Sequence, residues 1–255
     1  MKLIKFSYQG RSAEGVVIGD NVHVITSWNS AAEHPPFTLP TYSRNDLQAL
    51  AAECKEVVPL NEIAFAAPVG PASKIICLGF NYKNHVDETN AEVGPTPPLF
   101  ARWSDSLVGH DIPLIAPYAS DTYDFEGEIA VVIGKRGRRI SKSEADKHIL
   151  GYTCFFDGSL RAYQKHSPTA GKNFPRSGSM GPWIVTPDEA GKPEQFVLET
   201  RINGSIVQST VGALMIFDIP TIIAYVSEFT ELNPGTLLQQ VRRAASAQSV
   251  SHHYG

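Results

Sequence analysis

The chain has 255 residues, enough for one large domain with its own core, and its 42% hydrophobic and 19% charged residues are typical of a soluble globular protein. A formal net charge of −4 gives no electrostatic reason to expect nucleic acid or an anionic membrane as a partner. No apolar run is long enough to cross a membrane, and the first residues lack the apolar core of a signal peptide, so a cytoplasmic location is expected.

Residues 1–65 are predicted to form a small N-terminal β module. Three short strands joined by turn residues are expected, followed by an amphipathic helix that Ser43 and Asp46 begin as a capping box. A Pro- and Gly-rich stretch then predicts a boundary near residues 60–73, before a larger domain over residues 70–235. The elements expected in this module are the strands 1–10, 13–20 and 21–28 and the helix 43–56.

Strands also dominate the rest of the chain. A hairpin is predicted around the Asn203–Gly204 turn, because alternating residues flank a dipeptide that favours tight turns. Ser141 and Glu144 predict a helix start over residues 141–150, and Pro220 predicts another in its first turn. Further strands are expected at 74–80, 112–117, 123–134 and 151–159, and a helix at 221–232. Without a regular strand–helix repeat, the fold class is expected to be α+β and β-rich.

Two carboxylates interrupt the apolar strand 123–134. Glu126 and Glu128 lie two residues apart, so their side chains share one face of a strand, about 7 Å apart. Ionised carboxylates in a sheet interior are costly unless a cation lies between them. Asp157 ends another apolar strand, and three carboxylates without a Cys or His ligand pattern suit Mg²⁺ or Mn²⁺. The alternative is an edge strand on which both glutamates face solvent.

Other polar residues are candidates for catalysis or binding. His85 and Glu88 are three residues apart, so on a helical turn they share a face and form a pair able to deprotonate water. Lys172 and Arg102 are cations in apolar or Gly-rich surroundings and could hold a carboxylate or an enolate oxygen. Each could equally be an ordinary surface side chain. Two more polar residues would line the same cleft if a helix follows Asp157: Arg161 and Gln164.

The order of six segments resembles the fumarylacetoacetate hydrolase family: CLGFNYKNHVDE, PPLFARWSDSLVG, YDFEGEIAVVIGK, GYTCFFDGSLRAYQ, AGKNFPRSGSMGPWIVT and INGSIVQS. The resemblance implies a mixed β-sandwich roll that usually forms a homodimer. It implies that Mg²⁺ or Mn²⁺ is held by Glu126, Glu128 and Asp157. It also implies that the water-activating pair is His85 and Glu88, that Lys172 stabilises an enolate, and that the substrate contacts are Arg102, Arg161 and Gln164.

The function implied is hydrolysis of a C–C bond in 2,4-dioxo acids of the acylpyruvate or fumarylpyruvate type, in the catabolism of aromatic compounds. The same scaffold also allows a 2-hydroxyhepta-2,4-diene-1,7-dioate isomerase or an oxo-acid decarboxylase, because the same base could shuttle a proton without adding water. The partner in each case is a small oxo acid. A further alternative is a protein that binds metal but is catalytically impaired.

Residues 236–255 depart from the family, which continues with a strand and a Thr-Gly-Thr-Pro loop. We expect no strand here, because alternation is missing. One base added after the codon for Gly235 lets the following codons spell Asp-Val-Ile-Ala-Thr-Gly-Thr-Pro-Gly-Gly-Val-Gly. The hypothesis is therefore a tail translated out of frame that replaces the closing strands. A divergent terminus that forms a helix is the alternative.

Overall fold

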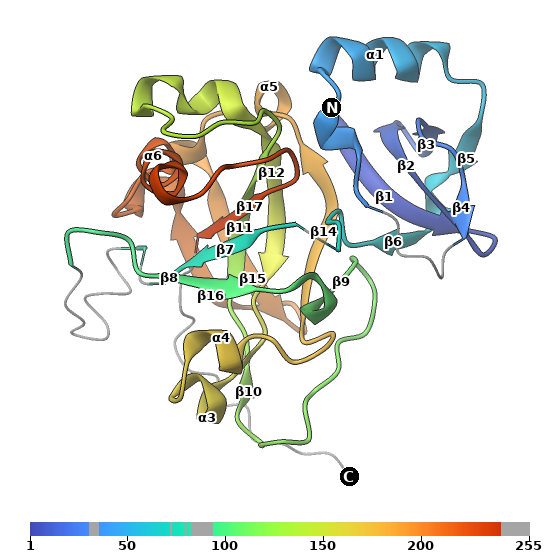
Figure 1. Ribbon diagram of the computed structural model, residues 1–255. Helices are drawn as coiled ribbons and strands as arrows, with labels where there is room; N and C mark the ends of the chain where they lie inside the picture. Colours follow the sequence, from blue (N-terminus) through green and yellow to red (C-terminus); the bar gives the residue numbers. More distant parts are fainter. Residues whose placement is uncertain (31–35, 72, 80, 83–93, 241–255) are drawn as a thin grey trace.

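The computed structural model describes residues 1–30, 36–71, 73–79, 81–82 and 94–240 of the chain. Within them, 13 strands form one mixed sheet, whose main path has the order β5-β3-β2-β1-β14-β12-β11-β17-β7-β8 (Figure 1). This confirms the expected strand-dominated fold class. The strands are β1 (Lys2–Tyr8), β2 (Arg11–Ile18), β3 (Asn21–Val24), β4 (Asn29–Ser30), β5 (Val57–Pro59), β6 (Ala64–Ala66), β7 (Ile75–Leu78), β8 (Leu99–Arg102), β9 (Leu107–Val108), β11 (Gly127–Ile133), β12 (Ile149–Phe156), β14 (Gly178–Val185) and β17 (Leu237–Gln240).

Two small sheets and several short helices complete the described residues. The small sheets pair β10 (Tyr123–Asp124) with β13 (Ser159–Leu160), and β15 (Val197–Ile202) with β16 (Ser205–Val211). The α-helices are α1 (Arg44–Glu53), α3 (Arg161–Gln164), α4 (Pro168–Gly171), α5 (Pro187–Ala190) and α6 (Ile219–Phe229). The 3₁₀ helices are η2 (Leu39–Thr41), η3 (Leu60–Glu62), η4 (Ser104–Ser106), η5 (Lys142–His148), η6 (Pro193–Gln195) and η7 (Gly212–Leu214). No described helix is long and apolar enough to span a membrane.

The N-terminal lobe, residues 1–66, contains β1 to β6 and α1. Helix α1 begins as predicted, because the Ser43 side chain accepts from the Asp46 amide and Asp46 accepts in return from the Ser43 amide. The lobe has its own apolar cluster, which includes Ile4 and Phe6 on one face of β1. Leu3, on the other face of β1, instead packs into the core of the main sheet.

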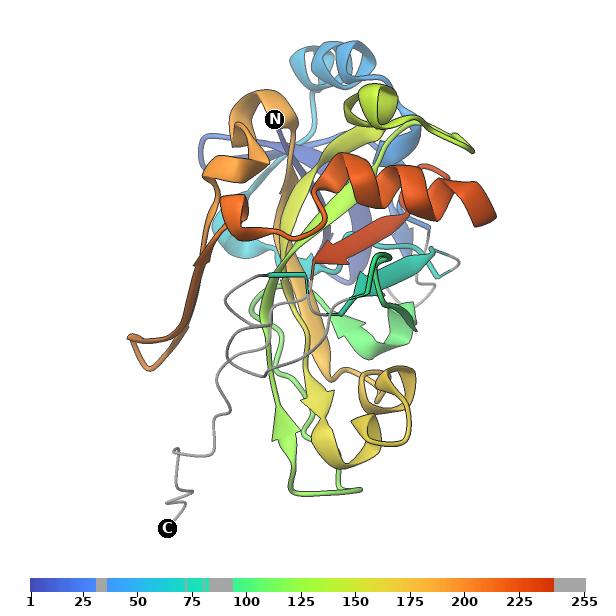
Figure 2. The ribbon, with the colours of Figure 1, turned by 90° about the vertical axis from the view of Figure 1, so that its left-hand side faces the viewer.

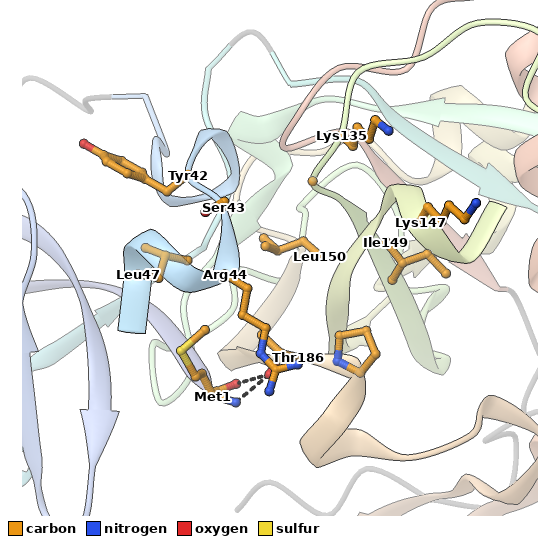
Figure 3. A pocket seen from close by; sticks show the side chains of 12 residues that line it. Met1, Tyr42, Ser43, Arg44, Leu47, Lys135, Lys147, Ile149, Leu150 and Thr186 are labelled. Carbon is orange, nitrogen blue, oxygen red and sulfur yellow. Dashed lines mark hydrogen bonds between the residues drawn. The ribbon is translucent and has the colours of Figure 1, made fainter. Parts of the chain in front are cut away.

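Strand β1 also joins the lobe to the rest of the sheet. Lys2 and Leu3 pair with Val185 and Ile184 of β14, so the ladder is continuous from the lobe into the main domain. A pocket lies where α1 approaches β12 and β14, and there the Met1 amine donates to the Thr186 hydroxyl (Figure 3). The N-terminal lobe is thus an extension of the main sheet.

Strand β11 carries apolar residues on both faces, as its run of buried side chains predicts. On one face, Ala130 and Val132 belong to the core shared with the N-terminal lobe. On the other, Val131 and Ile133 pack in the cluster that includes the buried residues of α6. Helix α6 therefore covers one side of the sheet (Figure 2). Glu126 and Glu128 alternate with Gly127 and so lie on the opposite face of the strand.

Some of the elements that short sequence motifs predict are present, and others are not. The hairpin β15–β16 turns at Asn203 and Gly204, whose φ angles of 48° and 82° are the left-handed values such a turn requires. Residues 141–150 do not form the predicted α-helix: η5 is a 3₁₀ segment, and Ser141 makes no capping hydrogen bond from its side chain. Residues 112–117 form no strand, which fits the presence of Pro113 and Pro117 within the run.

Residues 237–240 contradict the expectation that no strand follows Gly235. They form β17, a fully buried strand that lies between β11 and β7 in the main sheet. Leu238 pairs antiparallel with Val131 and in parallel with Ile76. The segment forms a strand although its glutamines have low β-propensity, because both of its neighbours offer unpaired backbone groups and apolar faces.

Candidate active site

The register of β11 and β12 brings two of the predicted carboxylates together. Gly127 pairs with Phe156, so Glu126 and Asp157 lie opposite each other just beyond the paired residues, and the Asp157 amide donates to the Glu126 carbonyl at 2.8 Å. Glu128 lies two residues along the same strand face. All three carboxylates are buried, with exposed fractions of 2% or less.

A lysine lies between the two opposed carboxylates. Lys172, at the end of α4, donates from Nζ to Glu126 Oε2 at 2.6 Å and also to Asp157 Oδ2. Burial alone would lower the pKa of Lys172, but Asp157 and Glu126 outweigh it and raise the pKa. The ammonium is therefore charged, and it supplies the cation that two buried carboxylates require.

Arg102 completes the neutralisation of Asp157. Its guanidinium donates to Asp157 Oδ1, to the Gly158 carbonyl at 3.2 Å, and to the hydroxyls of Ser106 and Ser177 at 3.2 Å each. Burial would raise the pKa of Asp157, but Lys172 and Arg102 prevail and lower it. With 1% of its surface exposed, Arg102 contacts protein groups on all of these sides. Its predicted contact with substrate stays a prediction.

Arg161 lies on the outer side of the same cluster. Its Nη2 contacts Glu126 Oε1 at 3.0 Å, and its Nη1 donates to Gln164 Oε1 at 2.7 Å. Its Nε donates to Asp124 Oδ2 at 2.8 Å. Burial would lower the pKa of Arg161, but Glu126 and Asp124 raise it. With 16% of its side chain exposed, against 0% and 1% for the other two cations, Arg161 is the cation of the cluster most open to a ligand.

These residues form a balanced group, here called the charge cluster: Asp124, Glu126, Asp157, Arg102, Arg161 and Lys172. Sequence analysis identified all of its members except Asp124. Removing any one member would leave a buried charge without compensation, the costly outcome for a buried ion pair. The signal that could have found Asp124 is its position two residues before Glu126, on the same face of an extended chain.

Gln239 is a second residue that sequence analysis missed. It pairs with Ala130 and Cys77, so it shares the strand face of Glu128, and it is fully buried. Gln239 lies beside Asp157 and contributes to lowering its pKa, although neither amide atom makes a hydrogen bond of good geometry in the described part of the chain. It was missed because residues 236–255 were not expected to form a strand.

The predicted water-activating pair, His85 and Glu88, lies outside the described residues. The chain just before it is firmly held: the Asn81 amide group donates to the Phe217 carbonyl at 3.0 Å, and the Phe217 amide donates back to Asn81 Oδ1 at 2.8 Å. Tyr82 then forms a bridge with Met215. The role of the pair stays a prediction.

The donor chemistry fits a divalent cation such as Mg²⁺ or Mn²⁺. Glu126, Glu128 and Asp157 offer the hard carboxylate oxygens that these ions prefer, at neighbouring positions of a buried site. In this site, the Lys172 ammonium lies between two of the three carboxylates, those of Glu126 and Asp157. Among the described residues, no three His, Cys, Asp or Glu side chains are grouped so as to hold a metal ion. The ligand roles therefore remain a proposal.

Comparison with known proteins gives the family. The model of the fumarylacetoacetate (FAA) hydrolase C-terminal domain matches residues 74–239, which include the whole charge cluster and all of β17 except its last residue. The chain belongs to the fumarylacetoacetate hydrolase family. A solved isomerase of 2-hydroxyhepta-2,4-diene-1,7-dioate from Mycobacterium marinum is 26% identical, with a TM-score of 0.75 over 97% of this chain and 89% of that one. The expected fold is thereby confirmed.

Two further relatives differ in reaction. The oxaloacetate tautomerase Fahd2a, mitochondrial, of Rattus norvegicus is 37% identical over 75% of this chain; the chain spans 62% of that relative's length. The maleylpyruvate hydrolase of Sphingobium sp. SYK-6, solved with manganese(II) and pyruvate, is 25% identical, with a TM-score of 0.76 over 96% of this chain and 89% of that one. The family is thus enzymatic and includes metal-binding members, and its members' reactions include tautomerisation, isomerisation and hydrolysis.

Proposed function

We propose that the protein is a divalent-cation-dependent enzyme that interconverts the keto and enol forms of a 2-oxo dicarboxylic acid. The observation that carries the proposal is the Lys172 ammonium, buried within the charge cluster at 2.6 Å from Glu126. Such a fixed cation stabilises an enolate oxygen without reorganisation, because water is excluded from its surroundings. The 37% identity with the rat oxaloacetate tautomerase supports this choice of reaction.

The role proposed for each residue follows from how exposed its side chain is. Arg161, the most open cation, is placed to bind a substrate carboxylate, which its planar guanidinium suits. Lys172 stabilises negative charge on the enolate, and His85 with Glu88 is proposed to carry the proton. Glu126, Glu128 and Asp157 would hold Mg²⁺ or Mn²⁺, an ion that polarises a 2-oxo carbonyl when bound. We propose a homodimer, and a cytoplasmic location stays a prediction because the rat relative is named as mitochondrial.

Hydrolysis of a C–C bond is the second candidate. It is favoured by the likeness to the Sphingobium maleylpyruvate hydrolase, whose structure contains manganese and pyruvate. Pyruvate is the product expected from cleaving an acylpyruvate, and its enolate needs the same stabilisation by a buried cation. The two reactions differ in whether water attacks a second carbonyl, so their products separate them.

The test follows loss of enol absorbance in oxaloacetate and, separately, in an acylpyruvate, with Mn²⁺ or with EDTA. The proposed function predicts conversion of oxaloacetate enol well above the spontaneous rate, abolished by EDTA and by Glu126→Gln. The exposed Glu53→Gln is the matched control and should behave as wild type. Two fragments from the acylpyruvate would favour the hydrolase instead. No metal-dependent change in either acid would contradict both and favour the catalytically impaired alternative.

A further inference from the structure

Asp124 is the one member of the charge cluster without a role so far. It lies in β10, pairs with Ser159 of β13, and is 8% exposed. The strand β13 ends one residue before Arg161, so the small β10–β13 sheet sets the distance between Asp124 and that arginine. A carboxylate held this firmly beside a partly open cation is suited to orient it.

The contacts show how Asp124 holds Arg161. One carboxylate oxygen, Oδ2, lies 2.8 Å from Nε and 2.7 Å from Nη2 of the guanidinium. Two contacts along one edge fix the plane of a rigid guanidinium. With that edge fixed, Nη1 is directed to Gln164 and the far side of Nη2 to Glu126. Asp124 thus determines where the other donors of Arg161 point.

Among the described residues, the second oxygen of Asp124 makes no hydrogen bond that would give this carboxylate another role. Oδ1 is buried and has no hydrogen-bond partner in the described part of the chain. Leaving a buried carboxylate oxygen without a partner costs free energy, which a merely structural residue of similar size would avoid. The compensation comes from a single partner, Arg161.

We propose that Asp124 is a positioning residue, which orients Arg161 for the carboxylate of the oxo acid and so sets the affinity for that anion. The inference rests on the proposed function for the identity of the ligand. Arg161 is the cation to which it applies, because 16% of its side chain is exposed, against 0% for Arg102 and 1% for Lys172. Asp124 touches neither substrate nor metal in this role; it acts through Arg161.

The test is a double-variant cycle with separate KM and kcat values for oxaloacetate. Asp124→Ala should raise KM about tenfold while kcat changes less than about twofold, because binding is weakened and chemistry is not. Asp124→Asn should recover part of the loss, since its amide oxygen still accepts from Arg161 but carries no charge. Asp121→Ala, at an exposed position just before β10, is the matched control. In an Arg161→Ala background, Asp124→Ala should change KM less than about twofold.

An equal rise of KM in both backgrounds would overturn the inference, as would a fall of kcat without a change in KM. If the wild type shows no turnover, the proposed function fails, and the same variants are compared for Mn²⁺-dependent binding of oxalate by calorimetry. There, weaker oxalate binding in Asp124→Ala that disappears in the Arg161→Ala background supports the inference. Unchanged or additive binding overturns it.

Discussion

Gly127 shows how a single residue shapes this site. A Cβ at this position would lie 1.9 Å from Thr200 Oγ1, so any larger residue would have to displace the Thr200 side chain of the hairpin β15–β16. The Gln208 side chain then bonds both backbone groups of Gly127, at 2.9 and 2.7 Å. With one face of the strand closed in this way, Glu126 and Glu128 are directed to the opposite face. The Glu-Gly-Glu sequence thus places the hairpin β15–β16 on one face of the strand and the two glutamates on the other.

Without Lys172, the stability of the protein should depend on whether a metal ion is bound. Lys172→Met leaves Glu126 and Asp157 with one cation fewer, so in EDTA the free energy of unfolding should fall by about 3–5 kcal/mol. Mn²⁺ should restore part of it and should bind more tightly than to wild type, because the competing ammonium is gone. Denaturant unfolding with and without Mn²⁺ measures both effects. Lys147→Met, whose partner Glu144 is on the surface, is the control; equal behaviour of the two variants would contradict the prediction.

At the scale of elements, Glu14 ties the segment before η2 to β2. Its carboxylate accepts from the Thr38 and Leu39 amides at 2.9 and 2.7 Å and from the Thr38 hydroxyl at 3.1 Å. Burial raises the pKa of Glu14 above its ordinary value, although these hydrogen bonds act in the opposite direction. The folded lobe therefore retains this proton at a pH where the unfolded chain has lost it.

The pH dependence follows from that raised pKa. The contribution of Glu14 to stability is greatest below its ordinary pKa of 4.5 and decreases as the pH rises through the folded value. Relative to Glu14→Gln, the wild type should therefore lose part of its stability as the pH rises from below 4.5 to neutral. Denaturant unfolding of both proteins across this range measures the difference. A wild type that instead gains stability relative to Glu14→Gln as the pH rises would show that the hydrogen bonds dominate and that the pKa of Glu14 is lowered.

Features that depend on residues close together in the sequence could be predicted, and contacts between distant residues could not. The Asn203–Gly204 turn and the Ser43 cap follow from neighbours within four residues, and both formed. The periodicity of residues 123–134 placed two glutamates on one face of a buried strand. Which cations meet them depends on Lys172 and Arg161, which come from α4 and α3 and reach the carboxylates only in the folded chain. Strand β17 was missed because its pattern is weak and its partners are remote.

At the scale of the whole molecule, the N-terminal lobe and the main domain share one sheet, and residues of the lobe pack into the core of that sheet. Leu3 is fully buried in the main cluster although it belongs to the first strand. Leu3→Ala should therefore cost about 2–5 kcal/mol and lower the midpoint of one cooperative transition for the entire protein. Calorimetry checks this, with Val57→Ala, 44% exposed, as the control. Two separate transitions, only one of them shifted, would show that the lobe folds independently.

The position of β17 has a consequence for the order in which the chain folds. Leu237 pairs with Ile75 and Val132, so the centre of the sheet is closed by almost the last described residues. Contacts this distant in sequence form slowly, because a long loop must close before they are made. During synthesis, β7 and β11 therefore leave the ribosome with unpaired edges and exposed apolar faces, which invite aggregation until residues 237–240 emerge.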